Sequence, residues 1–156
     1  MAGSRVDTSA GASHKAAMDI SKPVRTGAPE QGSSLIDPIR RALESKDIEA
    51  FAGLYAEGAV FEEMSSLNPP AHPLVREGRE AILEHFQNTI LRDPISGWAR
   101  HLQSAEIVDA IETDEALAFT EVRTYAAGDK VVAQHLAHKR QGRIERDRVV
   151  VAWDAD

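Results

Sequence analysis

The first side chain in this chain that could do chemistry is an acid on a segment in which apolar and polar residues alternate. Residues 59–64 alternate in character, which is typical of a short β-strand, and Glu63 has the same parity as Ala59 and Phe61. Since Ala59 and Phe61 are expected to face an apolar interior, Glu63 would face it too. A carboxylate with apolar walls can exchange a proton near neutral pH. We therefore predict Glu63 as a catalytic base, with a solvated position at the edge of the domain as the alternative interpretation.

Histidines form a second set of candidates. His101 lies on a segment with β-strand character at 98–109, and His135 lies on a later segment of the same kind. Histidine exchanges protons near neutral pH, so either residue could act as acid or base if it lines a pocket. A satisfied structural role is the alternative for both. His72 and His85 are predicted to be exposed.

The stretch at 115–153 organises the chain and positions His135. It holds three β-rich runs separated by two turn signals, at 127–129 and at 141–142. Connections this short join antiparallel neighbours, because parallel strands need a longer crossover. Together with the strand expected at 98–109, the pattern predicts four antiparallel strands.

Helical spacing dominates the part of the chain before those strands. Apolar residues at 35–43 predict a first helix, and those at 48–55 predict a second one that begins after the cap residue Asp47 and ends at Gly58. A third helix is predicted from residue 77 or 78, with a buried face of Ile82, Leu83, Phe86 and Ile90, until Pro94 stops it.

Two shorter elements complete the expected order. Residues 65–73 are rich in proline and are predicted to be a loop or lid, and a short edge strand is expected at 75–76. Helices grouped on one face of an antiparallel sheet define an α+β fold.

Length, composition and charge limit the number of domains and the classes of binding partner that we expect. The 156 residues suffice for one domain, predicted at 34–156, and a disordered tail, predicted at 1–33. A net charge of −7 argues against nucleic-acid binding, and no apolar run is long enough to span a membrane. The absence of cysteine excludes disulfides and favours a cytoplasmic location. No histidine spacing matches a metal motif, and no glycine-rich phosphate loop is present, so we expect neither a metal nor a cofactor.

The element order and four segments resemble a known superfamily. The segments are RALESKDIEAFAGLYAEGAVFEE at 41–63, REGREAI at 76–82, DEALAFTEVRTY at 114–125 and VVAQHLAHKRQGRI at 131–144. They resemble the nuclear-transport-factor-2-like superfamily, and within it the ketosteroid isomerase and SnoaL-like polyketide cyclase group. The resemblance implies a cone-shaped α+β fold, with three N-terminal helices packed on a curved, mostly antiparallel sheet around an apolar pocket. It also implies a homodimer formed through the outer face of the sheet.

Of the functional residues of the isomerase, the catalytic base has a counterpart in this chain, but the two donors of the oxyanion hole do not. Glu63 falls on the isomerase's carboxylate base. The tyrosine of the isomerase's oxyanion hole corresponds to Ile39, and its protonated aspartate corresponds to Leu136, or to Gln134 or His135 in another register. Without both donors, a dienolate would not be stabilised, so we expect general acid–base chemistry rather than steroid isomerisation.

The resemblance also implies a pocket wall on two later strands. The inward-facing residues would be Leu117, Phe119, Glu121 and Arg123 on one strand and Asp147, Val149, Val151 and Trp153 on the last. Acids paired with an arginine can be tolerated inside a protein. The set is similar to the Asp–Arg–Asp arrangement of the limonene-epoxide-hydrolase branch, although the order here is Glu121-Val122-Arg123. The alternative places Glu121 and Arg123 as a charge pair on the outer face of the sheet.

These patterns favour a cofactor-independent enzyme of isomerase, cyclase or dehydratase type that acts on a small apolar organic molecule. The predicted catalytic residues are Glu63, His101, His135, Arg123 and Asp147. The predicted ligand-binding residues are Phe61, Phe119, Glu121, Gln134, Leu136, Val149 and Trp153. Epoxide opening is one alternative function. A non-catalytic ligand-binding or dimerisation module is another, and a protein that recruits partners through its tail is a third.

Overall fold

The structure is a computed structural model that describes residues 34–91, 102–126 and 128–154. The predicted tail at 1–33, the helix stop at Pro94 and the candidate His101 lie outside the described residues. Among the residues that are described, no helix has the length and apolar character that crossing a membrane requires.

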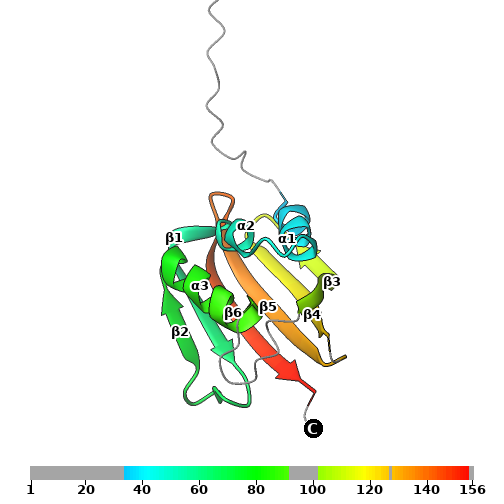
Figure 1. Cartoon of the computed structure of the whole chain (residues 1–156). Coiled ribbons are helices and arrows are strands. Elements are labelled where there is room, and N and C mark those ends of the chain that lie inside the picture. Colours follow the sequence, from blue (N-terminus) through cyan, green and yellow to red (C-terminus); the bar gives the residue numbers. More distant parts are fainter. Residues whose placement is uncertain (1–33, 92–101, 127, 155–156) are drawn as a thin grey trace, which may run out of the picture.

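A curved six-stranded sheet is the centre of the fold (Figure 1). Its strands are β1 (Tyr55–Met64), β2 (Leu74–Glu77), β3 (Leu102–Glu112), β4 (Ala116–Tyr125), β5 (Lys130–Arg140) and β6 (Arg143–Trp153), in the spatial order β2-β1-β6-β5-β4-β3. All neighbours are antiparallel except β1 and β6, which run parallel. The predicted antiparallel meander is therefore confirmed as β3 to β6, and the predicted edge strand is β2.

The turn between β5 and β6 explains one of the sequence signals. Only Gln141 and Gly142 separate the two strands, and both have positive φ, at 52° and 71°. A two-residue hairpin needs this backbone because its twist then matches the twist of the strands it joins. The register of β5 against β6 then shifts by one residue between Lys139 and His138, so the turn and this irregularity together decide which side chains meet on the inner face.

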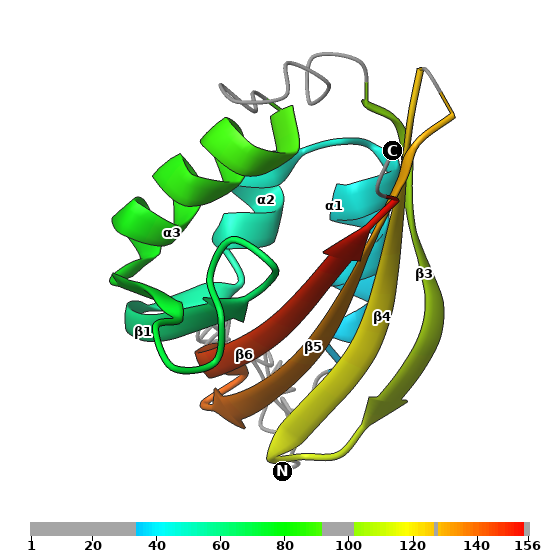
Figure 2. The same ribbon diagram turned by 90° about the horizontal axis from the view of Figure 1, so that it is seen from below.

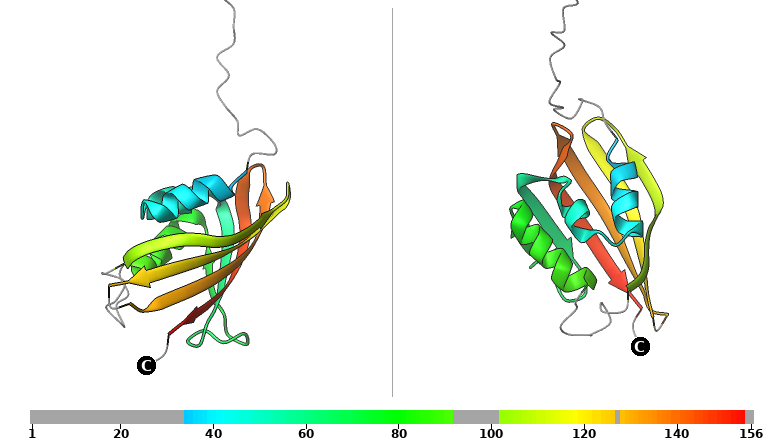
Figure 3. Two further views of the ribbon diagram at one scale, coloured as in Figure 1. Left: turned by 90° about the vertical axis from the view of Figure 1, so that its right-hand side faces the viewer. Right: turned by 45° about the horizontal axis from the view of Figure 1, so that its top comes forward.

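The helices lie on one face of the sheet (Figure 2). They are α1 (Ile36–Glu44), α2 (Ile48–Ala52) and α3 (Arg79–Phe86), and α3 continues into a π-helical turn, η1 (Gln87–Leu91). Helix α1 lies over the β3 side of the sheet, and α3 lies over the β1 side (Figure 3). A curved, mostly antiparallel sheet with helices on one face is the α+β class that the sequence predicts.

Helix α1 is tied to the sheet by a carboxylate from β3. Glu112 accepts hydrogen bonds from the Ser34 hydroxyl at 2.6 Å and from the backbone N–H of Leu35 at 2.7 Å. The Lys139 ammonium lies 2.7 Å from the same carboxylate. Burial alone would raise the pKa of Glu112, but these hydrogen bonds lower it. The start of α1 is thus capped from a distant strand, which sequence spacing does not reveal.

The end of the second helix corrects one prediction. Asp47 caps α2 as predicted, accepting from the Ala50 N–H at 2.9 Å, but α2 ends at Ala52 rather than at Gly58. Tyr55 belongs to β1, where it pairs with Ile144 of β6. Pairing with a central strand overrides the helical spacing of Tyr55, because the ladder also satisfies its backbone groups.

The inner face of the sheet and the helices enclose the apolar core. The largest fully buried apolar side chains include Tyr55, Tyr125, Phe51, Phe61, Ile39, Leu43, Ile82 and Ile90. On β4 the buried positions are Leu117, Phe119, Glu121, Arg123 and Tyr125, and on β5 they are Val131, Ala133, His135 and Ala137. The placement of Gln134 and Leu136 on the inner face is therefore wrong: both are exposed on the outer face, and Leu136 is 51% exposed. A one-residue error in register moves every side chain of a strand to the other face.

Candidate functional site

A network of polar side chains crosses the inner face of three adjacent strands. His135 of β5 lies between two carboxylates: its Nδ1 is 2.8 Å from Asp147 Oδ2 on β6, and its Nε2 is 3.4 Å from Glu121 Oε2 on β4. All three residues are buried, and the side chains of both acids are 0% exposed. Strand pairing alone brings them together, since each occupies an inward position on a neighbouring strand.

Two further residues complete this network. The Arg123 guanidinium binds Glu121 twice, with Nε 2.7 Å from Oε1 and Nη2 3.2 Å from Oε2. At the other end, the Tyr55 hydroxyl donates to Asp147 Oδ2 at 2.6 Å. Asp147 Oδ1 is buried and has no hydrogen-bond partner among the described residues. We call the five side chains Tyr55, Asp147, His135, Glu121 and Arg123 the buried network.

Aromatic rings hold the imidazole of the buried network in place. The ring of His135 stacks on Phe119, its partner in strand register, with centroids 4.2 Å apart and an interplanar angle of 6°. Phe51 of α2 approaches the same imidazole edge-on at 6.3 Å. With both ring nitrogens bonded and the ring face covered, His135 has no freedom to turn.

The electrostatics of the buried network keep His135, Glu121 and Arg123 charged. Burial alone would lower the pKa of His135, but Asp147 and Glu121 raise it to about 9. Burial alone would raise the pKa of Glu121, but Arg123 and His135 lower it to about 2. Glu121 also raises the pKa of Arg123 against the effect of burial. At neutral pH the network therefore holds an imidazolium and a guanidinium beside acidic partners, which is the pairing that buried charges require.

Tyr55 is a neutral member of the network. Burial is the main reason why its pKa is raised well above the ordinary value, and the neighbouring Asp147 adds to the shift. Tyr55 therefore keeps its proton and acts as a hydrogen-bond donor to Asp147. Because the sequence predicts a helix at this position, Tyr55 is not among the predicted site residues.

A second carboxylate–histidine pair lies nearer the solvent. Glu63 is on the inner face of β1, and its Oε2 is 3.0 Å from Nε2 of His85 on α3. The Glu63 side chain is 15% exposed and that of His85 is 4% exposed. The imidazole packs against Phe61 at 5.3 Å and Phe86 at 6.1 Å. We call Glu63 and His85 the rim pair.

The prediction that His85 is exposed is wrong, and His85 is a functional residue that the sequence analysis does not single out. It is buried, because it lies three residues after Ile82 and so on the same face of α3. That spacing is the signal in the sequence that could have found it. His72, by contrast, is exposed, as the sequence predicts.

The structure brings together many of the other predicted site residues. Glu121, Arg123, His135 and Asp147 meet in the buried network, while Phe61, Phe119 and Val149 are buried apolar wall residues and Trp153 is half-buried. The alternative that placed Glu121 and Arg123 on the outer face is wrong, because both side chains lie on the inner face. What each residue does in chemistry stays a prediction.

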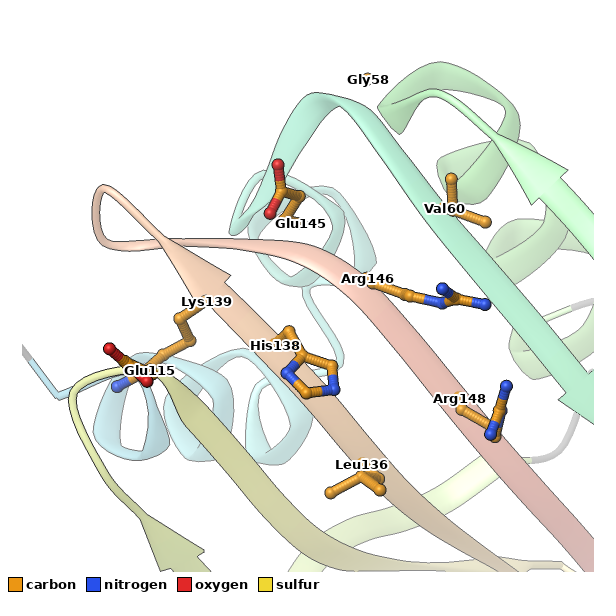
Figure 4. A pocket seen from close by; sticks show the side chains of 9 residues that line it. All are labelled: Gly58, Val60, Glu115, Leu136, His138, Lys139, Glu145, Arg146 and Arg148. Atoms are coloured by element: carbon orange, nitrogen blue, oxygen red, sulfur yellow. The ribbon is translucent and has the colours of Figure 1, made fainter.

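The outer face of the sheet has a hollow of its own (Figure 4). Its volume is about 860 Å³, and it is lined by Gly58, Val60, Glu115, Leu136, His138, Lys139, Glu145, Arg146 and Arg148. Arg148 Nε lies 3.3 Å from Glu62 Oε1, and Arg146 Nη2 lies 3.8 Å from Glu62 Oε2, so these cations already have a partner. The hollow therefore has mixed and largely compensated charge.

Metal ligation has no candidate among the residues at 34–91, 102–126 and 128–154. No group of three or more histidine, cysteine, aspartate or glutamate side chains there could hold a metal ion.

Comparison with known proteins identifies the fold. No protein-family model matches the chain, and no curated protein matches it. Solved structures do: an NTF2-like protein of unknown function from Burkholderia xenovorans has a TM-score of 0.58 at 12% identity, over 77% of this chain and 81% of that one. A Kribbella flavida protein provisionally named a ketosteroid isomerase has a TM-score of 0.57 at 16% identity, over 78% of each chain. An NTF2-like protein of unknown function from Mesorhizobium loti has a TM-score of 0.56 at 17% identity, over 77% of this chain and 95% of that one.

These likenesses show that the chain has the nuclear-transport-factor-2-like fold. The resemblance seen in the sequence is confirmed at that level. Because one fold supports many activities, the choice of reaction rests on the site and not on the neighbours.

Proposed function

We propose that the chain is a cofactor-independent enzyme that moves a proton on a small, largely apolar molecule, as isomerases, cyclases and dehydratases do. Glu63 is the base. The observation that carries the proposal is that Glu63 faces the apolar inner side of β1, is still 15% exposed, and makes no ion pair with lysine or arginine in the described part of the chain. The resemblance to the isomerase and cyclase group, and the name of the Kribbella flavida protein, support the same reaction type.

Glu63 is chosen as the base over Glu121 and Asp147 because the three carboxylates differ in their hydrogen-bond partners and in their access to solvent. A base must have a lone pair available within hydrogen-bonding reach of the substrate proton. Both oxygens of Glu121 accept bonds from Arg123 or His135, and Asp147 Oδ2 accepts two. Asp147 Oδ1 has no partner among the described residues, but the Asp147 side chain is 0% exposed, so a substrate has no access to it. Glu63 has a single partner, His85, in the described structure.

A proton-exchange assay tests the proposal. The full chain is incubated in heavy water with β-tetralone, an apolar ketone with acidic α-protons, and the loss of the α-proton signal is followed by NMR. Glu63→Gln should lower the enzyme-dependent exchange rate on the order of 10²-fold or more, because the base is gone. Glu62→Gln is the matched control, since Glu62 is the next residue on β1 but faces the outer side and binds Arg148. Equal exchange by wild type and Glu63→Gln would refute the proposal.

Epoxide opening is the second candidate, and the buried network favours it. Two carboxylates bridged by a cationic side chain are similar to the acid–arginine–acid arrangement of the epoxide-hydrolase branch, with His135 as the bridge here. In that reaction Asp147 takes a proton from water, the water oxygen bonds to an epoxide carbon, and the carbon–oxygen bond breaks. The new alkoxide takes a proton from the His135 imidazolium, and His135 regains a proton from the Asp147 carboxyl group. Hydrolysis of cyclohexene oxide to its diol by wild type, lost in Asp147→Asn but kept in Glu63→Gln, would select this function over the first.

The outer face is a candidate assembly surface, as the resemblance implies. Leu136, which lines the hollow of Figure 4, is 51% exposed, and Val150 is 49% exposed. Exposed apolar side chains grouped on one face are typical of an interface. Sedimentation of wild type and of Leu136→Asp would test the homodimer: a dimer that the substitution splits supports it, and a wild-type monomer refutes it.

A further inference from the structure

His85, the hydrogen-bond partner of Glu63, is more deeply buried than Glu63 and is held by aromatic rings on two elements. His85 is 4% exposed at its side chain, and its ring packs against Phe61 on β1 and Phe86 on α3. Its backbone carbonyl accepts the Thr89 hydroxyl at 2.8 Å, across the start of the π-helical turn η1. Such π-turns inside helices are frequent at functional sites. The imidazole therefore presents Nε2 to Glu63 from a rigid position.

The direction of the hydrogen bond follows from the chemistry of its two ends. An ionised carboxylate accepts hydrogen bonds and cannot donate them. When Glu63 is ionised, as a base must be, the proton of the 3.0 Å contact has to reside on Nε2 of His85. That bond occupies Oε2 and leaves Oε1 without a partner among the described residues.

We propose that His85 is the positioning residue of the base: its Nε2–H holds Oε2 of Glu63 so that Oε1 receives the substrate proton. The inference rests on the proposed function of Glu63 and names the atom and the partner that function uses. In the step, the substrate C–H bond breaks, its electron pair stays on the substrate, and the proton goes to Oε1. His85 keeps its own proton throughout.

A positioning donor and a proton relay predict different results for two substitutions. His85→Gln keeps an N–H near the position of Nε2 but does not titrate, whereas His85→Leu removes the donor. For β-tetralone exchange, His85→Gln should keep kcat within about threefold of wild type with an unchanged pH profile, and His85→Leu should lose on the order of 10²-fold in kcat with little change in KM. His138→Leu, at an exposed position on the outer face, is the control.

The same two variants give the outcomes that overturn the inference. If His85→Gln is as inactive as His85→Leu, histidine moves a proton itself and is not a positioning residue. If His85→Leu exchanges protons as fast as wild type, His85 has no role in the step. Circular dichroism of each variant excludes unfolding as the cause, and His85→Gln provides the test if His85→Leu fails to fold.

A measurement without substrate separates this inference from the proposed function. Nitrogen NMR of the labelled full chain should show His85 with its proton on Nε2, and Glu63→Gln should shift that signal because the acceptor changes. A proton on Nδ1 alone would overturn the inference. If wild type fails to exchange β-tetralone while Nε2 carries the proton, the proposed function fails and the His85 contact stands.

Discussion

Among the described residues, carboxylates contact histidine at two places on the inner side of the sheet, the buried network and the rim pair, and the surroundings of these two places differ. In the buried network, Asp147 and His135 are 2.8 Å apart, and each has a second partner, Tyr55 for the acid and Glu121 for the imidazole. In the rim pair, Glu63 and His85 are 3.0 Å apart, and aromatic rings are their main neighbours. Both places pair a carboxylate with an imidazole. Any difference in their behaviour therefore comes from their burial and from the charges beside them.

That difference favours a structural role for the buried network and, under the proposed proton-transfer function, a reactive role for the rim pair. A group in the buried network cannot gain or lose a proton without leaving an unpaired charge in the core, which costs several kcal/mol. Glu63 breaks no ion pair with a permanent cation in the described structure when it takes a proton. A fold can therefore use one type of pair to stabilise a core and another to do chemistry.

The largest effect is expected from breaking the buried network. Arg123→Met leaves Glu121 buried with His135 as its remaining cationic partner, and removing one partner of a buried pair typically costs about 3–5 kcal/mol. Chemical denaturation would measure the loss in unfolding free energy. Arg148→Met is the control, because its pair with Glu62 lies on the outer face with Arg148 51% exposed, and it should cost less than about 1 kcal/mol. Similar costs for both variants would contradict the comparison.

The next effect is a loss of stability at alkaline pH. Asp147 and Glu121 raise the pKa of His135 to about 9 against the effect of burial, from an unfolded value near 6.5. The folded state binds this proton more tightly than the unfolded state, so the contribution is complete below about pH 6.5 and is lost as pH rises through 9. Its size is about 3 kcal/mol. Unfolding free energies measured from pH 6 to about pH 10 should fall in wild type and stay flatter in His135→Gln.

The fold was predictable because its signals are local. The two turn signals and the alternation of β4 to β6 predict the meander, and Gly78 at the start of α3 has a φ of 90°, which a glycine adopts without strain. The boundary between α2 and β1 was not predictable from spacing. Tyr55 follows Phe51 at four residues, as in a helix, and only its pairing with the distant Ile144 makes it a strand residue.

The site was predictable in part, for a related reason. Alternation shows that Glu121 and Arg123 share a face, and the resemblance placed that face and Asp147 inward. On β5 the resemblance allows more than one register, and the strand has small and polar residues on both faces that do not decide between them, so Gln134 and Leu136 were placed on the wrong side. The contact between Glu63 and His85 joins a strand to a helix across 22 residues of sequence. No spacing rule within a single element encodes such a contact, since it depends on how α3 packs on β1.

A smaller effect on stability is expected at the rim pair. Glu63→Gln keeps the shape of the side chain and can still accept from His85, so the unfolding free energy should change by less than about 1 kcal/mol. Asp147→Asn, the matching change in the buried network, should cost more, because Asp147 Oδ2 accepts from both Tyr55 and His135. Denaturation of the two variants side by side measures this. A larger loss for Glu63→Gln would mean that the rim pair is structural.

The smallest expected effect is the energetic coupling between the two pairs. In strand register, Val149 of β6 lies between Glu63 of β1 and His135 of β5. Two strand spacings separate the backbones by about 10 Å, and changes at that distance with no shared partner usually add within about 0.5 kcal/mol. A double-mutant cycle of Glu63→Gln and His135→Gln, read as unfolding free energy, should therefore show a coupling below about 0.5 kcal/mol. A coupling above about 1 kcal/mol would mean that the imidazolium of His135 acts on Glu63 through the apolar layer. The base and the buried network would then be one electrostatic unit, and the separation of structural from reactive pairs would fail.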